Sequence, residues 1–491
     1  MTHEGVVGSL DKKYQGSAIV AKAGLWYTIC NFLFKGMVFI TTPVFSRLMS
    51  KAELGEFSTF SSWVSILMVI SSFDFSQSII RSRLELEHDM DSYIWSILSL
   101  STIWTAFLYL IVCLFMPFFS RLFSIQGRFI HVMFLYLFTA PAYSMLITKH
   151  RACYKYKTFV ALTGLMTVSG TLISLLLVIA MEDKLAGRIY GYYLPCIAIG
   201  LVIFVILAVR GRQIKITHWR YACRLMLPLV PHVLSLYMLA QSDKIIITRL
   251  CGKEYTAVYA IAYTAYSVVS VLFESMNKAW APWLLDSLHH EKYGEIRKAS
   301  KAYISVFIVL VVGMLLLVPE IILILGGRKY AGAIYCLPPL VTSCAVQFIY
   351  TMYVNIEFYK KKTVGVSLAT MAATAINILL NYIFIPMDPA HSYVIAAYTT
   401  LTGYVILLIL HYIMVRRLGL DHVYDIGFIV KILLALLAVS GVMNLLYSHT
   451  VLRYALVLAY GAALLAFALR NRDRILQLLK RKKPKEAAKA T

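Results

Sequence analysis

Six ionisable side chains lie inside long apolar stretches of this sequence, where a charge is costly. They are Lys35, Asp74, Asp243, Lys244, Glu274 and Lys278. An ionised side chain at the centre of a bilayer costs roughly 2.5–3.5 kcal/mol even on a lenient insertion scale. We therefore expect most of these groups to face a wet cavity or one another rather than lipid.

The polar residues around these charges suit an anionic ligand that carries sugars. Lys35 lies in the middle of its apolar stretch, one helical turn from Asn31, and has no acid on the same stretch. Lysine can hold a phosphate group as a point charge. Tyrosine rings, hydroxyls and amides suit hexose rings, and one set of them recurs at helical spacing between 256 and 283. This set is Tyr259, Tyr263, Tyr266, Ser270, Glu274 and Asn277.

Two of the acids have basic neighbours, so their roles stay open. Glu274 and Lys278 are four residues apart and can pair on a helix. Asp74 lies near the end of its stretch, with Arg81 just beyond it. Structural ion pairing is the alternative to a role in ligand binding or proton exchange.

A further polar stripe and an adjacent charge pair complete the candidates. Asp243 and Lys244 are neighbours in the chain and should point about 100° apart on a helix, so they are not simple partners. The stripe lies either at the cavity or at a tight seam between helices, where Ser and Thr are also common. Its members are Thr363, Ser367, Thr370, Thr374, Asn377 and Asn381.

The composition indicates that membrane-spanning helices position these groups. The chain has 491 residues, of which 60% are hydrophobic and 14% charged, and its mean hydropathy is +0.74. About twenty apolar residues span a bilayer, and lipid permits only hydrogen-bonded helices there. We predict fourteen spans near 24–46, 56–80, 93–119, 129–148, 158–181, 186–209, 225–248, 256–283, 302–325, 332–359, 364–386, 391–414, 428–447 and 452–470.

The basic residues predict the orientation. If the N-terminus is cytoplasmic, the inner segments hold most of the 47 Lys and Arg, as the positive-inside rule requires. Both termini are then cytoplasmic, and the basic tail can contact anionic lipids. We expect a multi-pass protein of the plasma (inner) membrane and no nucleic-acid partner, because no basic domain of useful size exists.

The chain repeats itself. "SRLMSK" at 46–51 matches "TRLCGK" at 248–253, and "YKYKT" at 154–158 matches "YKKKT" at 359–363. Six helices separate the copies, so the halves are parallel repeats. We predict a cytoplasmic segment 1–23, an N-lobe 24–212, a C-lobe 213–417, two added helices within 418–470, and a basic tail 471–491.

The loops leave little room for an enzyme. None exceeds about twenty residues, whereas a soluble catalytic domain needs at least fifty or so. No phosphate-binding GxxxxGK[ST] loop is present, and we expect no cofactor and no metal. Transport would then run on a substrate or ion gradient, with Asp74, Asp243 and Glu274 as candidate titrating groups.

Several stretches carry a family resemblance. The chain resembles the oligosaccharide flippase, or polysaccharide transporter (Wzx-type), family of the MATE-like MOP superfamily. The resemblance lies in "QSDKIIITRLCGKEYTAVYAIAY", "SRLMSKAELGEFSTF", "FDFSQSIIRSR" and "NKAWAPWLLD". The third stretch has Ser76 where the family more often has Gly.

The resemblance implies a flippase that moves polyprenyl-diphosphate-linked oligosaccharides of the undecaprenyl type from the cytoplasmic to the periplasmic face. Such units feed O-antigen, capsule, exopolysaccharide or lipopolysaccharide synthesis, beside a polymerase and chain-length machinery. The family's cavities are cationic, which implicates Lys35, Lys244 and Lys278. A MATE-like small-molecule antiporter is the alternative, and a membrane glycosyltransferase or polymerase is a weaker one.

Overall fold

The computed structural model describes residues 17–86 and 89–472, apart from the side chains of Leu84 and of several residues in the first helix. Every regular element in this part of the chain is helical. The α-helices are α2 (Ser17–Leu48), α3 (Lys51–Ser72), α4 (Ser78–Glu85), α5 (Met90–Leu114), α6 (Met116–Phe123), α7 (Gly127–Ala152), α8 (Tyr156–Ala180), α9 (Lys184–Gly211), α10 (Ile216–Met226), α11 (Val230–Leu250), α12 (Lys253–His289), α13 (Tyr293–Leu316), α14 (Val318–Gly326), α15 (Ala333–Tyr359), α16 (Thr363–Phe384), α17 (Ser392–Arg417), α18 (Ile426–Leu446) and α19 (Thr450–Arg470).

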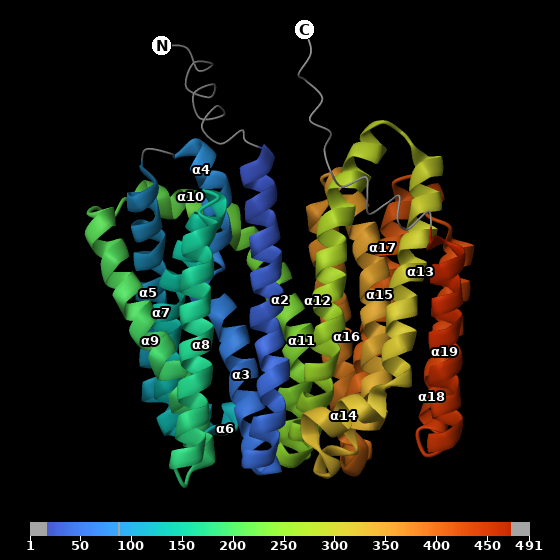
Figure 1. The fold of residues 1–491 in the computed structure, drawn as a ribbon. Helices are drawn as coiled ribbons and strands as arrows, with labels where there is room; N and C mark the ends of the chain where they lie inside the picture. The colour runs from blue at the N-terminus through green and yellow to red at the C-terminus, as the bar shows by residue number, and fades with distance from the viewer. Residues whose placement is uncertain (1–16, 87–88, 473–491) are drawn as a thin grey trace.

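The predicted all-α membrane fold is confirmed. Thirteen helical segments of the described chain are long and apolar enough to cross a membrane. The 32-residue helix α2 runs beside them and corresponds to the first predicted span, 24–46, which brings the number to the fourteen predicted. Helix α2 begins, and α19 ends, at the upper face in Figure 1, which we call the terminal face.

Three predicted spans were wrong in detail, because each is broken. The stretch 56–80 is interrupted after α3, where Phe73 and Asp74 both adopt left-handed backbone angles before the short 3-10 helix Phe75–Gln77. The stretches 93–119 and 302–325 also break, one residue before α6 and α14, each of which carries a proline in its first turn. Proline is favoured in a first turn and cannot continue a preceding helix.

The helices form two bundles that stand side by side in Figure 1. Helices α2–α9 form the first, which we call the N-lobe, and α11–α17 form the second, the C-lobe. The short helix α10, which we did not predict as a separate element, lies between them in sequence at the terminal face. The exact domain limits stay predictions.

Helices α18 and α19 lie against the outside of the C-lobe. Only Arg453 is buried on α19, and its guanidinium pairs with both carboxylate oxygens of Glu320 on α14, at 2.6 and 2.5 Å. Tyr447 at the end of α18 donates to the Leu315 carbonyl at 2.9 Å. These contacts attach the added helices to the C-lobe.

The two copies of the repeated turn meet each other between the lobes. In the first copy, Ser50 and Glu53 form a capping box that begins α3. In the second, Gly252 with φ 123° begins α12. Gly55 on α3 lies so close to the backbone of Lys253 that an added Cβ would sit 1.8 Å from that carbonyl oxygen. The lobes are therefore in backbone contact at the face opposite the terminal face.

Candidate functional site

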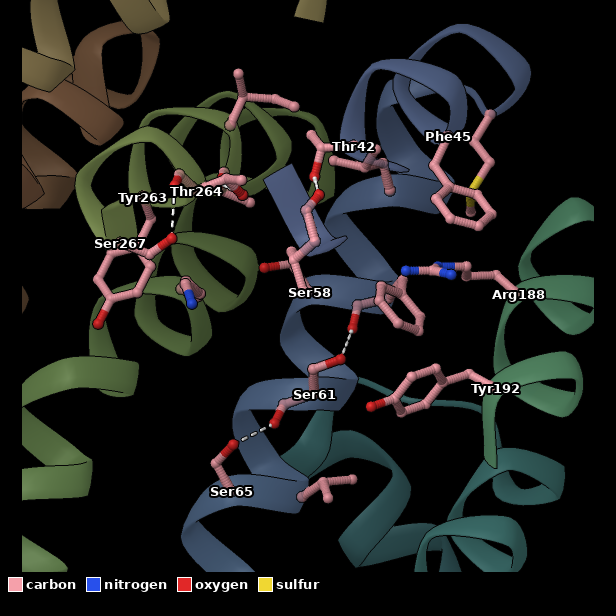
Figure 2. Close-up of a pocket in the computed structure, with 18 of the residues that line it drawn as sticks. Thr42, Phe45, Ser58, Ser61, Ser65, Arg188, Tyr192, Tyr263, Thr264 and Ser267 are labelled. Carbon is pink, nitrogen blue, oxygen red and sulfur yellow. Dashed lines mark hydrogen bonds between the residues drawn. The ribbon is translucent and has the colours of Figure 1, made fainter. Parts of the chain in front are cut away.

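A cavity of about 580 Å³ lies between the lobes. Side chains of α2, α3, α7 and α9 line it from the N-lobe, and side chains of α11 and α12 from the C-lobe. The helices that begin each lobe, α2 and α3 in the N-lobe and α11 and α12 in the C-lobe, all contribute to it. Figure 2 shows its labelled residues.

Arg188 is the most distinctive cation of the cavity, and sequence reasoning missed it. Its guanidinium carbon lies 3.5 Å from the ring centroid of Phe45 and 4.5 Å from that of Phe57. One of its nitrogens donates to the Ser174 hydroxyl at 2.9 Å. Within the described residues, Arg188 forms no ion pair. Figure 2 shows it reaching from α9 towards Phe45.

The local sequence of α9 explains this placement. Asp183 caps the helix by accepting from the Ala186 amide at 2.9 Å. Gly187 and Gly191 then face α8 so closely that a Cβ would lie 2.7 Å from the Leu177 carbonyl or 2.3 Å from the Ser174 Cα. Small residues four apart allow such backbone contact in membrane helices. Arg188 follows the first glycine directly, so this packing fixes its height in the cavity.

Lys244 is the second cation at the cavity. It is 8% exposed, donates to the Gln241 side-chain oxygen at 3.0 Å, and lies 4.0 Å from the ring centroid of Tyr263. Such a cation–π contact favours a positive charge in a desolvated place.

The rest of the cavity wall is polar but uncharged, or apolar. Among the described residues that line it, none is acidic. The hydroxyl-bearing and aromatic groups are Thr42, Ser58, Ser61, Ser65, Thr264, Ser267, Ser270, Tyr136, Tyr192, Tyr193, Tyr263, Tyr266, Phe45 and Phe57. The wall thus combines positive charge with hydrogen-bonding groups and ring faces.

Asp243 does not face the cavity. Its carboxylate is fully buried in the C-lobe and accepts hydrogen bonds from Asn381 at 2.7 Å, from Thr400 at 2.6 Å and from the Tyr259 hydroxyl. The predicted separation of Asp243 from Lys244 is confirmed, because the two side chains have different partners. Tyr259 was predicted to share the cavity face of its helix with Tyr263. In the structure its hydroxyl instead bonds to Asp243 inside the C-lobe, and Tyr259 does not line the cavity.

The polar stripe on α16 belongs to a seam between helices. Thr370, Thr374, Asn377 and Asn381 are all buried, and α16 packs against α11 and α17. Thr374, for example, donates to the Ser235 carbonyl of α11 at 3.0 Å. Of the two interpretations that the sequence left open, the seam is the one observed.

Asp74 and Arg81 lie apart from the cavity wall. Asp74 occupies the break after α3, where it accepts from the Ser76 hydroxyl at 3.2 Å. Arg81 is exposed on α4 and pairs with Glu85 at 2.8 Å. The alternative of an ion pair between Asp74 and Arg81 is therefore not observed, because the backbone break turns α4 away as a separate helix.

The inner half of α12 also differs from expectation. Asn277 accepts from the Asn355 amide at 2.9 Å, which ties α12 to α15. Lys278 is exposed, and the predicted Glu274–Lys278 ion pair is not formed within the described structure. Neither Glu274 nor Asn277 is among the described residues that line the cavity. The side chains of Asn31 and Lys35 lie outside the described residues, so their predicted roles stay predictions.

Two signals in the sequence pointed towards Arg188 without identifying it. It follows the first glycine of "GRIYG", a spacing typical of close helix contact. It is also the one basic residue of the predicted span 186–209, with Lys184 and Arg210 just outside that span. Its position near one end made it resemble an ordinary residue of the membrane interface.

Comparison with known proteins places this arrangement in context. The family described as polysaccharide biosynthesis protein matches residues 20–288. Protein 1 of the Lsg locus of Haemophilus influenzae is 25% identical over 155 residues, which are 31% of this chain and 38% of that protein. The match thus spans well under half of that relative.

Two solved structures share the fold over most of their length. The lipid II flippase MurJ in an inward closed conformation has a TM-score of 0.64 and 13% identity, with 90% of this chain and 100% of that chain covered. An inward-facing multidrug resistance MATE family transporter of the MOP superfamily has a TM-score of 0.56 and 12% identity, with 78% and 95% covered. At such identities the similarity establishes the fold.

Proposed function

This chain belongs to the polysaccharide biosynthesis protein family, and from that premise we propose that it is a flippase for lipid-linked oligosaccharides. The cargo would be a polyprenyl diphosphate of the undecaprenyl type that carries a sugar unit. The protein would move it from the cytoplasmic to the periplasmic face of the inner membrane by alternating access. The sugar unit would then enter O-antigen, capsule or exopolysaccharide synthesis.

One observation carries the proposal: the cavity presents Arg188 and Lys244 and, among the described residues that line it, no carboxylate. A guanidinium can bind phosphate oxygens through two parallel hydrogen bonds, and an ammonium adds a point charge. Lys244 is buried and Arg188 is half-buried, and this partial exclusion of water strengthens their attraction for an anion. The hydroxyls and tyrosines beside them would serve the sugar rings.

The orientation and partners extend the same proposal. Basic residues concentrate in the segments that would be cytoplasmic, and α2 begins at the same face at which α19 ends. We place that terminal face in the cytoplasm. A polymerase and chain-length machinery would receive the delivered unit.

The two alternative functions fit the cavity less well. A MATE-like antiporter for cationic drugs would need negative charge at the cavity, whereas its described charges are positive. A membrane glycosyltransferase or polymerase would need an acidic catalytic group near the sugar. Asp243, an acid close in sequence to the cavity, is turned away from it and fully hydrogen-bonded.

We further propose that Asp243 couples transport to a cation gradient. Its hydrogen-bond partners are three neutral donors, and within the described residues its carboxylate forms no ion pair. Desolvation makes such a charge costly, and a proton or a monovalent cation would offset it. The helices that hold Asp243 include α11, which also carries Lys244 at the cavity.

The transport proposal is tested by removing each cavity cation in turn. In proteoliposomes, Arg188→Met and Lys244→Met should each lower the flipping of a polyprenyl-diphosphate oligosaccharide. Loss of a charge-assisted hydrogen bond costs about 1.5–3 kcal/mol, which corresponds to a rate lower by about 10- to 100-fold. Purified, correctly inserted protein and a fluorescent cargo analogue provide the measurement.

Arg121→Met and Lys298→Met are matched controls, because both side chains are exposed and lie outside the cavity wall. They should leave the rate within about twofold, as is usual for surface substitutions. Unchanged flipping in both cavity variants would contradict the proposed site. Active export of a cationic drug, together with inactivity towards the diphosphate cargo, would favour the antiporter.

A further inference from the structure

A single atom, the side-chain oxygen of Gln241, connects the cavity to the contact between the lobes. It accepts one hydrogen bond from the Lys244 ammonium at 3.0 Å and another from the Ser62 hydroxyl at 3.1 Å. Lys244 lines the cavity, whereas Ser62 belongs to α3 in the other lobe and is fully buried. An amide oxygen has two lone pairs, and both are used here.

The bond to Ser62 is one part of a seam between α3 and the C-lobe. Thr59 and Thr248 share a hydrogen bond of 2.6 Å, and Lys253 pairs with the buried carboxylate of Glu56 at 2.5 Å. Together with Gln241–Ser62, these contacts define what we call the lobe seam. It holds the lobes together on the side away from the terminal face, as the positions of α3 and α11 in Figure 1 show.

The Ser62 bond can be exchanged at little cost. A hydroxyl has one proton to donate, and the Ser58 carbonyl on the same helix lies 2.9 Å from the Ser62 oxygen. Ser62 can therefore turn from Gln241 to Ser58 without leaving a buried donor unpaired, which is the expensive outcome. A hydrogen bond whose donor has a second acceptor within reach is suited to a contact that must open and close.

We infer that Gln241 is a positioning residue that links the occupancy of Lys244 to the closure of the lobe seam. The inference rests on the proposed function, since it assumes that Lys244 meets an anionic ligand. In the ligand-free protein, the ammonium fixes the Gln241 amide with its oxygen towards Ser62. An anion in the cavity draws the ammonium away, the amide loses that orientation, and the seam opens to release the cargo.

The opening of the lobe seam can be measured as the distance between two spin labels, one on each lobe, at the face opposite the terminal face. Leu48 at the end of α2 and Leu323 on α14 are exposed and lie in different lobes, so labels there separate when the seam opens. The accessible native cysteines are first replaced by serine; these are Cys113, Cys153, Cys223 and Cys251. The full-length protein is reconstituted in lipid and studied without ligand.

Gln241→Leu should raise the ratio of open to closed molecules about fivefold, the equivalent of one typical hydrogen bond. Lys244→Met should raise it by a similar factor, because the amide is no longer held. The double variant should match either single variant, since residues that act through one contact are not additive. Gln241→Glu keeps an acceptor for both partners and should restore the closed state.

Gln213→Leu is the matched control, because Gln213 is exposed and lies outside the cavity wall and the seam. It should leave the distances unchanged. Closed populations that are equal in Gln241→Leu and the parent protein would overturn the inference. Full additivity in the double variant would also overturn it, because the two residues would then act independently.

Farnesyl diphosphate separates this inference from the proposed function. It should open the seam in the parent protein and have no further effect on Gln241→Leu, although both proteins bind it. If neither protein binds the probe, the proposed cargo is wrong, while the ligand-free distances still decide whether Gln241 holds the seam for Lys244. If Gln241→Leu still opens on binding as the parent does, the inference fails and the proposed function stands.

Discussion

Asp243 and Lys244 are adjacent residues with opposite surroundings. The aspartate is enclosed by hydroxyl and amide donors within the C-lobe, and the lysine lies at the cavity beside Tyr263. One helical position is enough to separate them, because successive side chains on a helix point about 100° apart. A charge pair in the sequence is thus divided between two sites in the structure.

Replacement of Asp243 by Asn tests its proposed role in coupling. The amide has nearly the same shape, and the hydroxyls of Tyr259 and Thr400 can rotate to suit it, so the lobe should still fold. We expect flipping in proteoliposomes to lose its stimulation by an imposed proton or sodium gradient, because the exchangeable charge is gone. Binding of farnesyl diphosphate should stay within about twofold of the parent value, since the residue lies outside the cavity wall.

Asp286→Asn provides the control, because Asp286 is a surface carboxylate whose side chain is 75% exposed. It should keep the full response to the gradient. A response that persists in Asp243→Asn would assign the coupling to another group.

At the scale of elements, short polar contacts determine where helices begin and how they attach. Asp425 begins α18 by accepting from the Phe428 amide at 3.0 Å. It also meets Lys301 at 2.6 Å and Arg297 at 3.2 Å, both on α13. The same carboxylate therefore caps α18 and joins it to α13.

The attachment of α18 should depend on pH. The hydrogen bond from Lys301 is the main cause that holds the pKa of the Asp425 carboxyl below its usual range. A pKa that is lower in the folded state adds stability above the unfolded value of about 3.9. That stability is lost as the pH falls through the lower folded value. Asp425→Asn, which can still cap the helix, should therefore unfold at a lower temperature than the parent at pH 7.

Thermal unfolding in detergent at pH 7 and at pH 3 provides the comparison. The difference between parent and Asp425→Asn should shrink at the lower pH, because pH 3 lies below the unfolded pKa of about 3.9. The unfolded parent then gains a proton that the folded carboxylate does not bind, which favours the unfolded state. Asp286→Asn again serves as a control with little effect. A difference of equal size at both pH values would show that the charge of Asp425 does not stabilise this attachment.

At the scale of the whole molecule, the structure is a pair of lobes in contact at one face. Gly55 makes the closest approach, with its α-carbon against the backbone of Lys253. Thr59 and Glu56 follow on the same side of α3 and reach across to the C-lobe. Backbone cannot move aside as a side chain can, so the closed arrangement of this face has no room for a side chain at position 55.

Gly55→Ala should favour the state in which this face is open. The added methyl group would overlap the Lys253 carbonyl, and overpacking of this kind costs about 1–3 kcal/mol. The ratio of open to closed molecules should rise about 5- to 100-fold, as measured by the label distance between Leu48 and Leu323. Gly441→Ala is the matched control, because a Cβ there would meet nothing within 4 Å.

An unchanged distance in Gly55→Ala would mean that the contact with Lys253 can relax within the closed state. A lower unfolding temperature without any change in distance would point instead to a loss of general stability. The expected combination is a longer distance with folding preserved.

The sequence by itself determined the helical membrane fold, the number of spans and the parallel repeat. These follow from local physics, because lipid requires every backbone group to be paired within its own helix. The match of "SRLMSK" with "TRLCGK" also located the two turns that meet in the structure. The breaks near Phe115 and Leu317 were not foreseen, since apolar residues continue across both of them. The break near Asp74 was not foreseen either, although it falls in the mostly polar stretch "SSFDFSQS".

Only the tertiary structure decided which polar side chains share a surface. Arg188 reaches the cavity because Gly187 and Gly191 let α9 approach α8, and Asp243 leaves it because partners from three other helices surround it. Helical spacing gives the direction of a side chain relative to its own axis. How the helix is rotated, and what its neighbours offer, is set by packing between segments far apart in the chain.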